Sequence, residues 1–246
     1  MARLLQRVVD PPHACTYLPD QVASLDTRLM VDVEPDELEA MLSRGWRRFG
    51  PVYFRPLCSP CMGCVTLRVP VATFVPSSSQ KRAAKKAASL RREWSAPRVD
   101  SERLRLYGAW HAQREIARGW DPSVLDRQRY AQDFAFPHPS AREVAFYDDA
   151  DGGRLVALGI VDRTPNAFSA VYFFYDPARA RDSLGVANVV LLLDDARRLG
   201  LAHVYLGYRV KGCASLEYKE RFGPHEVLVG RPAPNVEPEW VPGSSS

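Results

Sequence analysis

The hydrophobic and polar pattern of this chain predicts helices and strands in a mixed α+β order. Residues 1–33 read as extended, because three prolines there forbid a long early helix. Helical periodicity and helix-start residues predict helices at 35–42, 80–90, 100–118, 125–134, 186–199 and 214–222. Short apolar or alternating runs predict strands at 52–54, 65–69, 143–147, 155–162, 168–175, 203–207 and 226–229. This order, with a meander followed by alternating helices and strands, is typical of the α+β class.

The pattern of predicted elements changes at Ala96-Pro97, which predicts that the chain consists of two regions and a tail. Residues 1–95 are expected to form a basic N-terminal region with the cysteines, 96–235 a C-terminal domain, and 236–246 a tail whose last residues are disordered. The element order of the C-terminal domain resembles the acyltransferase (GNAT-type) fold that binds acetyl-CoA. Those enzymes hold the pyrophosphate on a glycine-rich loop before a helix. The matching stretch, 179–187, has only Gly185, so acetyl-CoA is not the expected donor.

Positive charge is concentrated in one stretch of the chain. From Arg44 to Arg92 there are eleven Arg and Lys residues and no Asp or Glu, in a chain of formal net charge +4. On the helix predicted at 80–90, like charges stand one turn apart and repel each other. This stretch therefore predicts a polyanionic partner, and the alternative is a solvated basic face.

Composition and cysteine count favour a soluble protein of the cytoplasm. The chain is 46% hydrophobic and 25% charged, values that are ordinary for a globular protein. No apolar run approaches the roughly 18 residues that a membrane span needs. The N-terminus, interrupted by Arg3 and Arg7, makes a poor signal peptide. Five cysteines without an export signal are expected to stay reduced.

The cysteine spacing predicts a metal site. Cys58, Cys61 and Cys64 are two residues apart, and thiolates so spaced can bind one tetrahedral metal from a single loop. Cys15 is the expected fourth ligand once the chain folds back. Structural zinc and an iron–sulfur cluster both suit this spacing. The alternative is a reduced loop whose cysteines only pack.

Motifs in order from about residue 13 to residue 231 resemble a known family. The matching segments are Cys15-Thr-Tyr17-Leu18-Pro19-Asp20, Gly45-Trp46-Arg47-Arg48-Phe49-Gly50, the cysteine loop with Val65-Thr66-Leu67-Arg68, Ser169-Ala-Val-Tyr172-Phe-Phe-Tyr175-Asp176-Pro177, Tyr205-Leu-Gly207-Tyr208 and Tyr218-Lys219-Glu220-Arg221-Phe222. They resemble the arginyl-tRNA–protein transferases, specifically the bacterial branch of aspartate/glutamate leucyltransferases. Ser78 departs from the family pattern, which has Arg in that place.

The resemblance implies an aminoacyl transfer that depends on tRNA. Leucine, or alternatively phenylalanine, would pass from its charged tRNA to a protein that begins with Asp or Glu, and the product is a degradation signal of the N-degron (N-end rule) pathway. No cofactor is expected for the transfer itself. The polyanionic partner becomes the tRNA acceptor stem, bound by Arg47, Arg48, Arg55, Lys81, Arg82, Lys85 and Lys86.

Residues of the matched motifs are the candidates for the active site. Asp176 is the candidate for accepting the amine proton, with Tyr208 and Lys219 as further catalytic candidates. Lys219, Arg209 or Arg221 is expected to bind the acceptor carboxylate, since a fixed cation is required there. Tyr172, Tyr175 and Tyr208 are candidates for stacking on the terminal adenosine or donating to the oxyanion, joined by Tyr17 if the N-terminal half folds over the site. The five histidines form no cluster and receive no role.

Two other functions remain open at this point. Arginine could be the transferred residue, because the residues do not reveal the side-chain pocket. The chain could also be a metal-stapled RNA-binding protein with an inactive acyltransferase fold. No Ser-His-Asp or Cys-His pattern is present, which favours direct aminolysis over a covalent intermediate.

Overall fold

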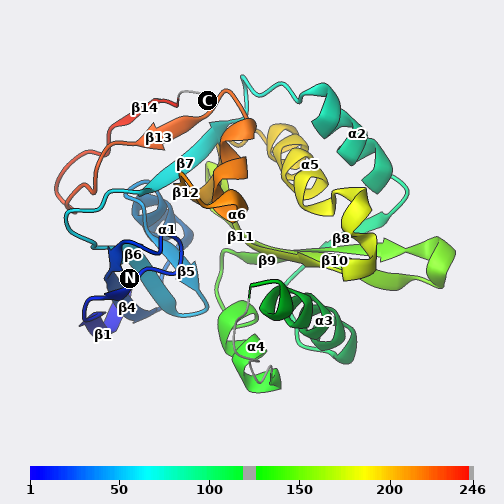
Figure 1. The fold of residues 1–246 in the computed structure, drawn as a ribbon, viewed down its shortest axis with the longest axis horizontal. Helices are drawn as coiled ribbons and strands as arrows, with labels where there is room; N and C mark the ends of the chain where they lie inside the picture. The colour runs from blue at the N-terminus through cyan, green and yellow to red at the C-terminus, as the bar shows by residue number, and fades with distance from the viewer. Residues whose placement is uncertain (119–125, 244–246) are drawn as a thin grey trace.

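The computed structural model describes residues 1–118 and 126–243, which form two main sheets with helices on both faces of the larger one (Figure 1). The helices are α1 (Pro35–Leu42), α2 (Ser78–Ala87), α3 (Ser101–Arg118), α4 (Arg127–Phe134), α5 (Leu184–Arg198) and α6 (Ala214–Glu217), with 3-10 turns η1 (Asp149–Asp151), η2 (Pro177–Asp182) and η3 (Tyr218–Arg221). The strands are β1 (Arg3–Val9), β2 (His13–Ala14), β3 (Val22–Ala23), β4 (Leu25–Val31), β5 (Arg47–Phe49), β6 (Val52–Pro56), β7 (Cys64–Pro70), β8 (Arg91–Ser95), β9 (Ala141–Asp148), β10 (Arg154–Arg163), β11 (Ala167–Tyr175), β12 (His203–Val210), β13 (Glu226–Leu228) and β14 (Trp240–Pro242).

The predicted helix starts agree with local capping chemistry. Glu34 and Glu37 form a capping box at α1, with Pro35 in the first turn. Ser77 caps α2 by accepting a hydrogen bond from the Gln80 backbone at 3.3 Å. The predicted helix at 214–222 is instead α6 followed by η3. Residue 125, where another helix was expected to start, and residues 244–246 of the predicted tail lie outside the described residues.

The larger sheet joins the two predicted parts of the chain. Its strand order is β14-β13-β7-β12-β11-β10-β9-β8, so β7 lies inside it and β8 forms one edge. β7 pairs with β12 from Cys64↔Val210 to Pro70↔His203. Residue 95 therefore does not separate two independent sheets, because strands from both sides of it share one ladder. β14 adds an edge strand from within the predicted tail.

Strands β11 and β12 open a gap in the larger sheet. They form a parallel pair, unlike the other described pairs, and their register runs only from Ala167↔His203 to Ser169↔Tyr205. Both strands continue, to Tyr175 and Val210, without pairing with each other. Their C-terminal halves therefore diverge and leave room for a cavity inside the sheet.

Two hydrophobic layers sandwich this sheet. Helices α2 and α5 cover one face and α3 and α4 cover the other (Figure 1). Ala83 of α2 and Leu193 of α5 belong to the core of the first face. Tyr130 and Phe134 of α4 belong to the aromatic core of the second. In the described chain no helix is long and apolar enough to cross a membrane.

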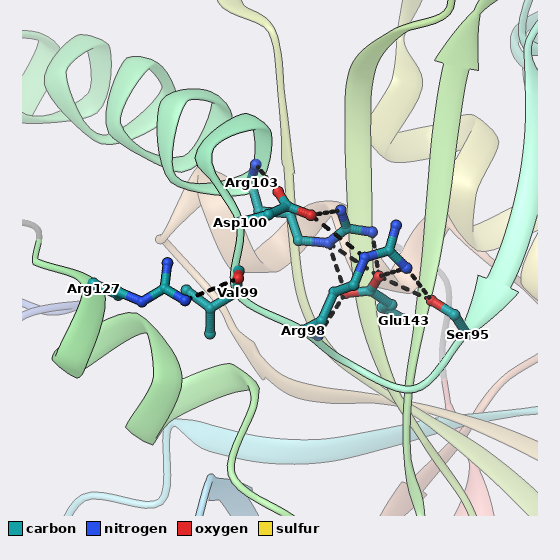
Figure 2. Close-up of polar contacts among 7 residues, drawn as sticks. All are labelled: Ser95, Arg98, Val99, Asp100, Arg103, Arg127 and Glu143. Atoms are coloured by element: carbon teal, nitrogen blue, oxygen red, sulfur yellow. Dashed lines mark hydrogen bonds and ion pairs between the residues drawn. The ribbon is translucent and has the colours of Figure 1, made fainter.

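A buried ion pair attaches helix α3 to the sheet. Figure 2 shows Arg103, in the first turn of α3, directed at Glu143 on β9, and the Arg103 Nε donates to the Glu143 carboxylate at 3.0 Å. Asp100 caps the helix by accepting from the Arg103 backbone at 2.9 Å, and Ser95 of β8 donates to Glu143 at 3.0 Å. Arg103 and Glu143 are both 0% exposed, so this pair ties helix to strand without contact with water, while Asp100 at the helix start is 36% exposed.

Candidate active site

A cavity of about 610 Å³ occupies the space where β11 and β12 diverge. Its walls come from both strands, from β5 and β6 of the smaller sheet, and from α3, the first turn of α5, α6 and η3. Aromatic rings dominate the lining, among them Phe49, Phe54, Trp110 and Tyr172. The N-terminal and C-terminal halves of the chain therefore build one site together.

The cavity is positively charged. Arg47, Arg48, Arg114 and Lys219 line it, and the described residues of its lining include no Asp or Glu. His111 is also present, and burial lowers the pKa of this histidine. An apolar, cationic cavity favours ligands with an uncharged part and an anionic part.

Arg47 spans the gap between the two strands. It is only 7% exposed, and its guanidinium donates to the Ser169 hydroxyl at 2.8 Å and to the Ala170 carbonyl, both on β11. On β12, Gly207 has a positive φ, and a Cβ there would lie 3.3 Å from Arg47 Nε. Glycine at this position therefore admits the guanidinium. Burial, followed by the charge of Arg48, lowers the pKa of Arg47.

Arg48 is neutralised inside the protein. Its side chain is 5% exposed and forms an ion pair with Asp162, which is 1% exposed. A second bond runs from Arg48 Nη1 to the Gly50 carbonyl at 2.8 Å. Arg47 and Arg48 were predicted to bind tRNA, and the structure buries both side chains instead of leaving them on an exposed surface. Each of these guanidinium groups is buried, one against β11 and the other against Asp162.

Lys219 lines the cavity from η3. Its amino group donates to the Tyr208 carbonyl at 2.8 Å. Burial and the nearby charge of Arg47 lower the pKa of Lys219 to about 7. A large share of this amine is therefore neutral near pH 7 and able to accept a proton, as a catalytic role would require.

The four candidate tyrosines all line the cavity. Tyr208 donates its hydroxyl to the Gly45 carbonyl at 2.8 Å, so its proton is held by the turn between α1 and β5. Burial raises the pKa of Tyr208. The Tyr172 hydroxyl lies 3.2 Å from His111 Nε2, and the ring of Tyr175 lies 4.4 Å from Trp110. Tyr17, 40% exposed, confirms that the N-terminal segment reaches the site.

Asp176 is directed away from the cavity. It caps η2 by accepting from the Ala178 backbone at 3.0 Å, and its other oxygen is bonded to Arg154. It is not among the residues that line the cavity. The interpretation of Asp176 as the proton acceptor is therefore wrong, and its position after a strand and before a proline reflects turn formation.

Arg209 and Arg221 also lie outside the cavity lining. Arg209 follows Tyr208 on β12 and is directed at Glu220, 3.5 Å away. Arg221 is exposed, and its carbonyl accepts a bond from Gln80 at 2.9 Å. Of the three cations expected to bind the acceptor, only Lys219 is in place. Adjacent residues face opposite sides of a strand, so Arg209 points away from the cavity that its neighbour Tyr208 lines.

Of the seven cations predicted to bind tRNA, those of α2 are exposed. Lys81, Arg82, Lys85 and Lys86 are exposed there, and Lys86 donates to the Arg181 carbonyl at 3.0 Å, just before α5 begins. Arg55, in contrast, is half-buried, lies over the Trp46 ring and donates to the Pro232 carbonyl at 3.0 Å. The helix thus remains available to a polyanion, while Arg55 supports the smaller sheet.

The predicted metal ligands lie near one another. Burial raises the pKa of Cys64 to about 12, and Cys58, Cys15 and Cys61 are close enough to raise it further. Backbone N–H groups lie 3.5 Å from Cys15 Sγ and 3.4 Å from Cys61 Sγ. In the described part of the chain, however, no three His, Cys, Asp or Glu side chains are arranged to hold a metal ion. The metal therefore stays a prediction.

Helix α3 contributes residues that the sequence analysis did not select. Trp110, His111 and Arg114 line the cavity, and Arg114 lies 4.5 Å from the Trp110 ring centroid. Arg114 lies one helical turn from both Trp110 and His111, so the three share one side of the helix, and the sequence shows this only as an amphipathic pattern. Nothing in the sequence indicated that this face meets β11.

Comparisons with known proteins agree with this architecture. The model of the arginine-tRNA-protein transferase C terminus matches residues 102–229, and that of the N terminus matches residues 13–82. An aspartate/glutamate leucyltransferase of Pseudomonas fluorescens (strain SBW25) is 38% identical over 224 residues, covering 89% of this chain and 92% of the relative. One of Stutzerimonas stutzeri (strain A1501) is 37% identical with the same coverage.

A solved structure shares the fold. FemX aligns with a TM-score of 0.51 at 9% identity, over 92% of this chain and 86% of FemX. At that identity the likeness shows the fold alone. It confirms the predicted α+β class with a GNAT-like mixed sheet.

Proposed function

Because this chain belongs to the arginine-tRNA-protein transferase family, we propose that it transfers an amino acid from a charged tRNA to the N-terminus of a protein. The transferred residue is leucine and the acceptors begin with Asp or Glu, as the names of its relatives state for those proteins. The product then carries a destabilising N-terminus and enters the N-degron pathway. Its partners are leucyl-tRNA and acidic N-termini, and the charged tRNA makes the cytoplasm the proposed compartment.

The charge of the cavity supports leucine over arginine as the donor residue. A buried guanidinium needs a carboxylate partner, since an uncompensated buried charge is strongly unfavourable. The described lining has no Asp or Glu, and the charge of Arg47, which has no ion-pair partner among the described residues, would repel an arginyl side chain. Aromatic and aliphatic walls suit an uncharged leucyl group instead.

The reaction is an aminolysis of an activated ester. The acceptor α-amine attacks the ester carbonyl, a C–N bond forms, and the C–O bond to the terminal ribose breaks. The proton lost by the amine passes to the neutral amine of Lys219, which returns it to the departing ribose oxygen. Orientation of the two reactants supplies up to roughly 7–11 kcal/mol, so positioning is the larger effect.

Two further elements support the reaction. The cations of α2 face solvent and suit the phosphates of the tRNA acceptor stem. The thiols of Cys15, Cys58, Cys61 and Cys64 have the ligand chemistry of a structural zinc or iron–sulfur site and lie near one another. In the described chain no three of them are arranged to hold a metal ion, so the proposal rests on their chemistry and spacing. The metal content of the purified protein tests this second proposal.

A transfer assay tests the function. Purified protein receives labelled tRNA charged with leucine, phenylalanine or arginine, together with peptides that begin with Glu, Asp or Ala. We expect leucine on the Glu and Asp peptides and none on the Ala peptide. Transfer of arginine would change the donor and contradict the reading of the cavity charge. Binding of tRNA without any transfer would overturn the enzymatic proposal.

A further inference from the structure

The four cations of the cavity differ in what neutralises them. Arg48 is paired with Asp162, and Arg114 lies against the Trp110 ring. Lys219 titrates near pH 7, so its charge is only partial there. Arg47 belongs to none of the ion pairs formed by the described residues, and it is 7% exposed. Its charge therefore has no ion-pair partner of its own among the described residues; Asp162, which pairs with Arg48, acts on it only from a distance.

The position of Arg47 is fixed before any ligand arrives. Its guanidinium is held by Ser169 and Ala170 on one strand and lies against Gly207 on the other. A guanidinium has more N–H donors than the two that these bonds use. Its planar fork matches a carboxylate, and a group already oriented loses little entropy on binding one.

We propose that Arg47 binds the side-chain carboxylate of the acceptor's first residue, Asp or Glu, and so forms the acceptor-specificity subsite. This inference rests on the proposed leucyl transfer and adds the residue that sets its acceptor specificity. In an N-terminal Asp or Glu the carboxylate and the attacking amine belong to the same residue, so their binding groups must be neighbours. Arg47 and Lys219 meet this condition, because both line the cavity and the charge of Arg47 acts on the Lys219 amine.

The test compares peptides that differ only in charge. Leucyl transfer is measured with peptides beginning with Glu and with Gln, and the readout is the ratio of their kcat/KM values. Arg47→Gln should lower this ratio by about 10- to 100-fold, because a hydrogen-bonded charge partner is lost. Arg47→Lys, which keeps the charge without the fork, should fall between the wild type and Arg47→Gln. Because both peptides are used with one preparation, partial unfolding cancels in the ratio.

Arg209→Gln is the matched control. It removes an arginine close to the site in sequence but directed at Glu220 outside the cavity, so the ratio should stay unchanged. An unchanged ratio in both Arg47 variants, or a collapse of the ratio in Arg209→Gln, would overturn the inference while leaving leucyl transfer intact. Failure of the wild type to transfer leucine to any peptide would instead overturn the proposed function itself.

Discussion

At the scale of single residues, Lys219 makes stability depend on pH. Burial and Arg47 lower its pKa to about 7, against weaker opposing effects of Cys213 and Cys64, while an unfolded lysine keeps its ordinary value of 10.5. Between these values the unfolded chain binds one more proton than the native protein. The free energy of unfolding therefore falls as pH drops through this window and levels off below about 7, by at most about 4–5 kcal/mol in total.

The variant Lys219→Met isolates this effect. Its stability advantage over the wild type should be largest near pH 7 and should shrink as pH rises toward 10.5, which urea unfolding of both proteins across that range measures. Transfer should be lost in the same variant while tRNA binding persists. A stability difference that is constant with pH would mean that Lys219 titrates normally and is a poor proton acceptor.

Single-residue roles were the hardest part to predict from sequence. Arg47 and Arg48 are adjacent, and both looked like surface cations within a basic stretch. One instead meets the carbonyl of Ala170 and the other meets Asp162, partners more than a hundred residues away. Charge alone predicts exposure, and only the tertiary structure decides which cations find a buried partner.

At the scale of elements, the long apolar segments were predicted well. The strands 155–162 and 168–175 and the helix 186–199 appear close to their expected bounds as β10, β11 and α5. β8 was missed because Arg91–Ser95 lacks an apolar alternation, and its place at the edge is held by pairing with β9. The divergence of β11 and β12 leaves no local signal, since it depends on which strand lies beside which.

The attachment of α3 yields a stability prediction. Glu143→Gln removes the buried carboxylate that pairs with Arg103 and leaves Asp100, 2.6 Å away, as its remaining partner, so it should lower the free energy of unfolding by about 3 kcal/mol, the low end for breaking a buried pair. Glu93→Gln is the control, because the Arg91–Glu93 pair is 44% and 50% exposed and should contribute less than about 1 kcal/mol. Urea unfolding measures both. Equal losses in the two variants would contradict a special contribution from the buried pair.

At the scale of the whole molecule, the cations of the basic stretch from Arg44 to Arg92 take up different environments in the fold. Of its eleven cations, Arg44, Arg48, Arg68, Arg91 and Arg92 have carboxylate partners within the described chain. Arg47 enters the cavity and Arg55 supports the smaller sheet. The remaining four lie on α2 and face solvent. Of eleven residues that could contact phosphates according to the sequence, only the four on α2, beside α5, stay exposed without a carboxylate partner among the described residues.

That helix makes a quantitative prediction for tRNA binding. If each of its four cations contacts a phosphate, together they account for a slope of about −3 to −4 in a plot of log affinity against log salt. Replacing Lys81, Arg82, Lys85 and Lys86 with Ala should flatten the plot by that amount, as measured by filter binding or fluorescence anisotropy of leucyl-tRNA. Arg127→Ala with Arg129→Ala is the control, since α4 lies on the opposite face of the sheet (Figure 1) and should leave the slope unchanged. A larger loss of slope in the control would place the tRNA on the α3–α4 face, and the basic run that α2 carries would then be a solvated surface.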